Sequence, residues 1–227
     1  MKAKFGAIVV AGSGKINGFV ASRNRAGAYF RTKVTPVNPQ TAAQNTVRSR
    51  LTTNAQAWRG LSEAQRASWN AAVSSFARTD IFGDLKNPSG FNLFVRLNNN
   101  LEAAGQSPLT AAPVPSEVLT VNFTGLAADV SDAEVVLTLS GNVPAGTSML
   151  IFATPGVSPG VNFVKSEYRL ISVQAAAATT PIDVGAAWIA KFGSLIADQK
   201  LFVKVVFVNN TTGQTSSAQS LSTIVVA

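Results

Sequence analysis

The sequence predicts an α+β protein with an extended N-terminal β-hairpin arm, a small three-helix region and a C-terminal all-β sandwich of the immunoglobulin or fibronectin type. Three changes of pattern along the chain predict these parts. Residues 1–37 alternate in strand-like runs around turn residues, residues 38–105 place apolar side chains at helical spacing, and residues 119–227 return to a period of two. The Pro-rich segment 106–118 is predicted to be a linker.

The basic arm, residues 1–37, is expected to contain two strands. They are residues 15–22 (KINGFVAS) and residues 28–34 (AYFRTKV), and the turn between them contains Asn24 and Gly27. In the second strand, cations and an aromatic ring alternate with mainly apolar side chains, which predicts one face of each kind. Because an isolated hairpin is at best marginally stable in water, the arm is expected to rest on its own helices or on a neighbouring subunit.

The first expected helix begins at Asn38, a suitable N-cap, with Pro39 at the first helical position, where its fixed φ fits. Apolar residues then recur at helical spacing and predict the buried side of this helix. These residues are Ala43, Val47, Leu51, Ala55 and Trp58. Gly60 is expected to end the helix.

Two further helices have N-terminal signals of their own. Ser62 and Gln65 have the spacing of a capping box, in which each side chain bonds the backbone of the other residue. Ser89 precedes a helical pattern that ends at Gly105. The apolar area of the three helices is modest, so packing against the arm or another subunit is expected to support them.

Residues 119–227 are predicted to form the sandwich. Strand-like runs separated by turn residues begin at residues 118–123 (VLTVNF) and end at the C-terminal LSTIVVA, and this number and spacing are typical of an immunoglobulin-like sandwich. One segment departs from the pattern. Residues 183–193 (DVGAAWIAKFG) predict a short helix that crosses one end of the sandwich.

The composition argues against enzymatic chemistry. The chain has neither Cys nor His, which excludes disulfides, thiolate nucleophiles, Cys/His zinc sites and Ser-His-Asp triads. Asp80 and Asp84 flank Gly83, where acidic residues ordinarily form turns, and no carboxylate pair suggests acid/base catalysis. We therefore predict a non-enzymatic protein with no catalytic residue, metal site or cofactor.

A glycine cluster at Gly12–Lys15 has the outline of a phosphate-binding loop. A Walker A motif requires glycine where Val9 stands and a hydroxyl residue where Ile16 stands. The dinucleotide-binding motif fails at Asn17, which occupies the position of its third glycine. The glycines are therefore expected to serve the backbone of a β-hairpin, and no nucleotide binding is predicted.

Charge is unevenly distributed. Residues 1–100 carry fourteen Lys and Arg against three Asp and Glu, whereas residues 101–227 carry five against eight, within a net charge of +8. The candidate contact residues of the basic half are Arg23, Arg25, Tyr29, Arg31, Lys33, Arg48 and Arg50. They suit either phosphate groups with stacked bases or acidic surfaces of neighbouring subunits. No run of about 18 apolar residues occurs, so no membrane partner is expected.

Two stretches resemble a pattern found in uncharacterised bacterial and bacteriophage proteins. They are residues 13–51, with the arginine-rich turn and NPQT, and residues 57–70 (AWRGLSEAQRASWN). A fibronectin-like module often follows in such chains, and residues 200–216 are similar to its final hairpin. The resemblance implies a component of a virus particle.

Two functions are carried forward from these observations. The first is a structural protein of a bacteriophage virion, assembled in the host cytoplasm, whose partners are copies of itself and other virion proteins. Capsid, connector and tail remain equally open. The alternative is a basic nucleic-acid-binding protein inside the particle. Steep loss of binding as salt rises would indicate the alternative, because phosphate contacts release counterions.

Overall fold

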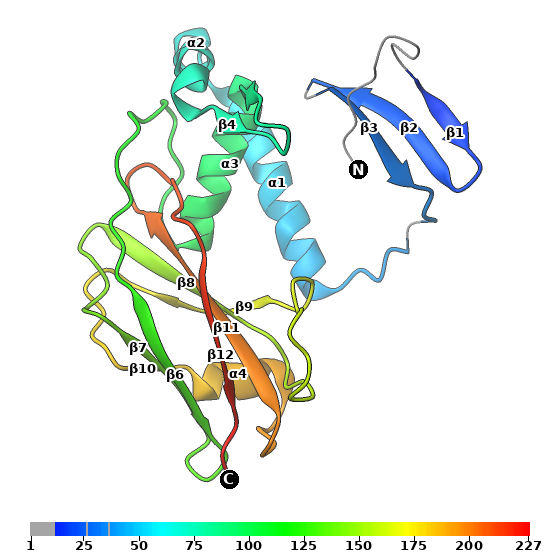
Figure 1. Ribbon diagram of the computed structural model, residues 1–227. Helices are drawn as coiled ribbons and strands as arrows, with labels where there is room; N and C mark the ends of the chain where they lie inside the picture. Colours follow the sequence, from blue (N-terminus) through cyan, green and yellow to red (C-terminus); the bar gives the residue numbers. More distant parts are fainter. Residues whose placement is uncertain (1–11, 26, 36) are drawn as a thin grey trace. The chain divides into compact units, whose positions relative to one another are not determined.

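The protein is described by a computed structural model, in which residues 12–25, 27–35 and 37–227 are placed (Figure 1). The predicted α+β class, with an N-terminal hairpin and a C-terminal β-structure, is confirmed. The chain divides into two compact units, and helix α1 runs across the division. The units are Met1–Ser49 with Arg78–Lys86, and Arg50–Ala77 with Asn87–Ala227.

The N-terminal sheet has three antiparallel strands in the order β1-β2-β3 (Figure 1). Their bounds are Gly14–Ile16 for β1, Phe19–Asn24 for β2 and Gly27–Thr32 for β3. The expectation of one continuous strand over residues 15–22 is wrong. Asn17, with φ of 49°, forms a turn with Gly18 between β1 and β2, and an Asn-Gly pair is a common choice for such hairpin turns. Residues 1–11 of the predicted arm lie outside the described residues.

Helix α1 covers Ala42–Gly60, so its predicted start at Asn38 is wrong. Gln40 has φ of 50°, a left-handed conformation that an α-helix cannot contain. The Thr41 hydroxyl instead accepts a hydrogen bond of 3.3 Å from the backbone N–H of Gln44, as an N-cap residue does.

The predicted stripe of α1 is buried only toward its C-terminal end. Val47 is 64% exposed and Leu51 is 49% exposed, so burial of the stripe is not general. Asn54 is buried instead, and its amide donates a 3.0 Å hydrogen bond to Oδ1 of Asn99. Trp58 is half-buried and contacts the rings of Phe91 and Phe94. The predicted stripe therefore packs against aromatic side chains near the C-terminal end of the helix.

The remaining helical elements surround a small aromatic core. They are α2 at Glu63–Ala72, the 3₁₀ helix η1 at Val73–Phe76 and α3 at Gly90–Ala103, with a ribbon of β4 (Arg78–Thr79) and β5 (Leu85–Lys86) between η1 and α3. The predicted capping box forms in full: the Gln65 N–H donates to Ser62 Oγ at 3.2 Å, and the Ser62 N–H donates to Gln65 Oε1 at 2.8 Å. Trp69 and Phe94 are both fully buried and meet edge to face.

Segment 106–118, the predicted linker, is tied to the helices at its N-terminal end. The Asn98 amide donates to the Leu109 carbonyl at 3.1 Å and accepts from the Leu109 N–H at 2.7 Å. The Trp69 indole N–H donates to the Thr110 carbonyl at 3.0 Å. In addition, the Asn100 amide donates to the Gly213 carbonyl of the sandwich at 2.8 Å.

The sandwich consists of two antiparallel sheets, in the orders β10-β7-β6 and β12-β11-β8-β9. The bounds are β6 Phe123–Asp129, β7 Glu134–Leu139, β8 Thr147–Ala153, β9 Arg169–Gln174, β10 Ile182–Asp183, β11 Lys200–Asn209 and β12 Gln219–Ile224. Side chains from both sheets, including Leu137, Met149 and Phe207, form one buried core. Seven strands in two such sheets constitute an immunoglobulin-like architecture.

The first strand of the sandwich lies later than predicted. Residues 118–123 were expected to form it, but β6 begins at Phe123, and only Phe123 is common to both. The register of β6 against β7 shifts between Phe123 and Gly125, which marks a β-bulge. The bulge and the small residues Gly125, Ala127 and Ala128 weaken the alternation that a sequence pattern can detect.

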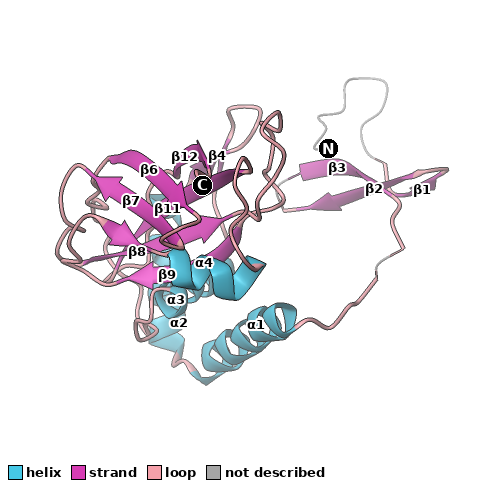
Figure 2. Cartoon of the chain, turned by 90° about the horizontal axis from the view of Figure 1, so that it is seen from below, coloured by secondary structure: helices cyan, strands magenta, loops and turns pink. Residues whose placement is uncertain are grey.

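One long side of the sandwich is closed by β6 and β12, which run parallel to each other. At the start of β12, the Gln219 side chain accepts from the Phe123 N–H at 2.7 Å and donates to the Val121 carbonyl at 3.0 Å. At the other end, Val226 pairs with Asp129 in a parallel bridge. The predicted short helix is α4, Gly185–Phe192, which packs against β7 and β9 (Figure 2).

Candidate functional site

The strand register gives the N-terminal sheet a cationic face. Lys15, Val20 and Arg31 are cross-strand partners in β1, β2 and β3, so their side chains share one face. Ser22 and Tyr29 form the next pair on this face. The Lys15 and Arg31 side chains are exposed, and Tyr29 is half-buried. We name Lys15, Val20 and Arg31 the cationic row of the sheet. The aromatic ring of Tyr29 lies on the same face.

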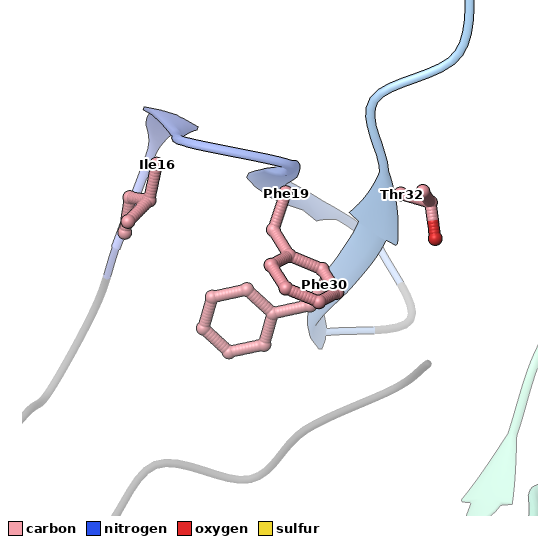
Figure 3. A pocket seen from close by; sticks show the side chains of 4 residues that line it. All are labelled: Ile16, Phe19, Phe30 and Thr32. Atoms are coloured by element: carbon pink, nitrogen blue, oxygen red, sulfur yellow. The ribbon is translucent and has the colours of Figure 1, made fainter.

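The opposite face of the sheet is apolar. Ile16, Phe19 and Thr32 are cross-strand partners, and Ala21 pairs with Phe30. Ile16 is 64% exposed and Phe19 is 57% exposed. Ile16, Phe19, Phe30 and Thr32 line a hollow of about 280 Å³ (Figure 3). Of these four described lining residues, three have large apolar side chains and one has a hydroxyl.

The structure separates the predicted contact residues of the arm. Tyr29 and Arg31 lie on the cationic face, and the Lys33 N–H, just after β3, donates to the Gly18 carbonyl at 2.8 Å. Arg23 pairs with Ala28 and therefore lies on the apolar face. Arg25 lies in the turn after β2 and is exposed. In β3, Tyr29 and Arg31 lie on one face and Phe30 and Thr32 on the other, which is the alternation predicted for this strand.

The two other predicted contact residues, Arg48 and Arg50, lie on α1. Nη2 of Arg48 donates to Oδ1 of Asn38 at 2.9 Å, so this guanidinium holds the segment that leads into the helix. Arg50 is half-buried. Neither residue belongs to the N-terminal sheet.

Sequence reasoning missed Lys15 and Ile16 as members of the two faces. Both lie in β1, which pairs with β2 through the turn at Asn17 and Gly18. The Asn-Gly pair was the available signal, because this dipeptide between strand-like residues favours a tight hairpin. Of the glycine cluster, Gly14 has φ of 123°, a backbone conformation that favours glycine, while Val9 lies outside the described residues.

The acidic residues of the described part of the chain are candidates for a metal site and for structural roles. No group of three or more acidic residues that could hold a metal ion occurs among them. Asp80 acts in a turn, because its Oδ1 accepts from the N–H of Phe82 at 2.8 Å and of Asp84 at 3.1 Å. Within the same part of the chain, no helix combines the length and the apolar character needed to cross a membrane.

Comparison with known proteins adds no relative. No protein-family model, curated protein or solved structure matches the chain.

Proposed function

We propose that this chain is a non-enzymatic structural protein of a bacteriophage particle, which assembles through its N-terminal sheet and carries the sandwich as a displayed or spacing module. The observation that supports assembly most strongly is the exposed apolar face of that sheet. Ile16 and Phe19 keep 64% and 57% of their surface exposed beside a hollow of about 280 Å³. Covering one such side chain fully is worth about 1.5–3 kcal/mol, which favours a partner.

The edges of the N-terminal sheet support the same proposal. In the described residues, β1 and β3 each pair with β2 alone, so each has a second edge. Such an edge can accept a strand from another chain, which adds main-chain hydrogen bonds to the apolar contact. The expected partners are other copies of this protein and other virion proteins. The attribution to a virion rests on the resemblance of residues 13–51 and 57–70.

The cationic row supports the alternative function, nucleic-acid binding. Lys15 and Arg31 flank Val20 across three strands, with Tyr29 on the same face. Arginine binds phosphate in a bidentate manner, and tyrosine stacks on bases. A basic nucleic-acid-binding protein inside the particle is therefore the second candidate.

Deletion of residues 1–35 tests the assembly function. We expect the deleted protein to keep a cooperatively melting sandwich but to lose self-association and incorporation into particles, measured by sedimentation and by composition of purified particles. Normal assembly of the deleted protein would contradict the proposal and would move the nucleic-acid alternative ahead.

A point variant tests the apolar face itself. Ile16→Ser with Phe19→Ser keeps the cations and the backbone, and we expect it to weaken assembly as the deletion does. Ile81→Ser with Leu85→Ser is the matched control, because these two side chains are also highly exposed, at 73% and 71%. Equal effects of the two double variants would show that exposure alone, and not this face, explains the loss.

A further inference from the structure

The two signs of charge are segregated along the chain. The first 62 residues contain ten Lys and Arg and no Asp or Glu. Residues 97–164 contain five Asp and Glu and no Lys or Arg. The N-terminal sheet lies in the first of these segments, and β6 and β7 of the sandwich lie in the second. Each segment therefore contributes side chains of one sign only.

The acidic surface lies at one end of β6 and β7. Asp129 and Glu134 are directly opposite each other in the register, and Val226 pairs with Asp129 on the other side. Asp132 is exposed in the turn between the two strands. No described residue forms an ion pair with any of these carboxylates. We name Asp129, Asp132 and Glu134, with Val226, the acidic row.

Asp129 and Glu134 place two like charges opposite each other in the acidic row. Like charges directly opposite on a sheet repel each other and destabilise the strand pair. The Asp129 carboxylate also accepts hydrogen bonds from the Ser131 hydroxyl at 2.6 Å and the Ser131 N–H at 2.7 Å, which lower its pKa and keep it charged. Cations placed against this row would offset the repulsion.

We propose that the cationic row of one copy, Lys15, Val20 and Arg31, docks on the acidic row of a second copy. The inference rests on the proposed assembly function and names the partner surface. The two rows are chemically matched, since the first has two cations beside a valine and the second has three carboxylates beside a valine. Val20 and Val226 thus lie beside the charged groups of their rows. Val20 is on the face of the N-terminal sheet opposite Ile16 and Phe19.

Charge disfavours Phe163, another exposed apolar side chain of the sandwich, as the docking surface. Phe163 is 84% exposed, but it lies between Asn162, which accepts from Nζ of Lys200 at 2.7 Å, and Lys165 two residues later. A basic sheet docking there would meet like charges, which is unfavourable. The acidic row has no such cation in β6, β7 or β10.

The cationic and acidic rows are different surfaces, so two copies can make one head-to-tail contact or two reciprocal contacts related by a two-fold axis. In the head-to-tail case each copy keeps one free row after the first contact. Repetition of a heterologous contact closes into a ring or continues as a filament, depending on the rotation between copies.

Sedimentation of the full chain at about 50 and 200 mM salt tests the proposal. We expect wild-type protein to self-associate, and Lys15→Glu with Arg31→Glu to raise the dissociation constant by about tenfold or more. We expect the same from Asp132→Lys with Glu134→Lys, which spares the hydrogen-bonded Asp129. A protein that is monomeric at every concentration and salt overturns the proposal.

Mixing and combining the variants makes the test direct. The cationic-row variant retains a normal acidic row, and the acidic-row variant retains a normal cationic row. An equimolar mixture should therefore regain association, because the two unreversed rows match in sign and the two reversed rows also match in sign. The variant with all four reversals should regain self-association, because the signs match again. Failure of both the mixture and the fourfold variant overturns a direct contact between the rows.

Matched controls change the net charge equally at other places. Arg59→Glu with Arg66→Glu lies on α1 and α2, and Glu117→Lys with Glu167→Lys lies elsewhere in the larger unit. We expect neither pair to alter association. An effect equal to that of the row variants would indicate a general charge effect and would overturn the proposal.

The remaining outcomes separate this inference from the assembly function and from nucleic-acid binding. If the deletion of residues 1–35 abolishes assembly but reversal of the acidic row does not weaken it, the partner surface is wrong and the assembly function stands. If a short DNA duplex binds tightly, loses affinity on reversal of the cationic row and is unaffected by reversal of the acidic row, while self-association is absent, the nucleic-acid alternative replaces the docking contact.

Discussion

Phe19 of the N-terminal sheet is 57% exposed, whereas Phe207 of the sandwich is completely buried, although both are phenylalanines in antiparallel strands. The difference lies in what faces each strand. In the sandwich, two sheets cover each other's inner faces, and one core includes side chains from both. The N-terminal sheet has three short strands, and Ile16 and Phe19 on its apolar face stay largely exposed. The sandwich therefore covers its own apolar faces, whereas the N-terminal sheet leaves two large apolar side chains largely exposed.

Truncation of each phenylalanine should give the largest difference in free energy of unfolding between the two regions. We expect Phe207→Ala to lower the free energy of unfolding by about 3–5 kcal/mol, because it leaves a cavity in a closed core. Phe19→Ala removes an exposed side chain and should change this free energy by less than about 0.5 kcal/mol. Urea denaturation of both variants measures the difference. A large loss of stability in Phe19→Ala would end the contrast between the two regions.

Replacing a glycine by alanine should destabilise the sandwich more than the N-terminal sheet, by a smaller difference in free energy than the phenylalanine variants give. A Cβ at Gly185 would clash with the carbonyl oxygen of Ala133 and with Glu134, both backbone positions that cannot easily move. We expect Gly185→Ala to cost about 1–3 kcal/mol. Gly18 in the N-terminal sheet faces open space, and Gly18→Ala should be nearly neutral. Thermal unfolding of the two variants checks this, and similar melting temperatures would show that α4 can yield.

Helix caps extend the comparison to the two compact units. Ser62 caps α2 in the larger unit through both bonds of its capping box. Ser62→Ala should cost about 1 kcal/mol, and Thr41→Ala, which loses one long bond at an exposed helix start, about 0.5 kcal/mol or less. Denaturation curves and helical circular dichroism measure both. A larger effect at Thr41 would mean that the start of α1 is more important than its exposure suggests.

Acid should reveal the smallest effect, which concerns Asp129 of the sandwich. Hydrogen bonds from Ser131, first from its hydroxyl and then from its N–H, lower the pKa of Asp129. A lowered pKa stabilises the fold above the unfolded-state value of about 3.9, and this stabilisation is lost as pH falls through the folded-state value. Asp129→Asn should therefore be less stable than wild type near neutral pH, and the gap should shrink below about pH 4.

The N-terminal sheet provides the control for that titration. Residues 12–62 contain no Asp or Glu, so no carboxylate there can contribute to acid sensitivity. The gap is measured by denaturation of wild type and Asp129→Asn at a series of pH values. If the difference in stability between wild type and Asp129→Asn is constant from neutral to acidic pH, the substitution acts through packing and not through charge.

Local signals in the sequence were sufficient for several elements. The alternation of Tyr29 and Arg31 with Phe30 and Thr32 predicted the two faces of β3, because strand side chains point to opposite faces in turn. The capping box at Ser62 was likewise predictable, since it involves only neighbours in the chain. Such features depend on geometry within a few residues.

Features that depend on distant partners were not predictable in this way. The apolar stripe of α1 gave no sign that Val47 and Leu51 would remain exposed, because periodicity shows a face but not what covers it. The start of β6 was misplaced because its bulge is set by pairing with β7. The acidic row could not be read from the sequence either, since it requires the register of β6 and β7 and the bridge to Val226.

The parallel course of β6 and β12 has a mechanical consequence. Gln219 joins the strands near Phe123, and Val226 joins them near Asp129. Tension that pulls the start of β6 and the end of β12 apart acts along the strands, so it loads these bonds in shear, together and not one after another. Unfolding under force is governed by the rate of crossing the unfolding barrier, and simultaneous loading raises that barrier. The bonds between β6 and β12 therefore make the sandwich resistant to stretching along its length.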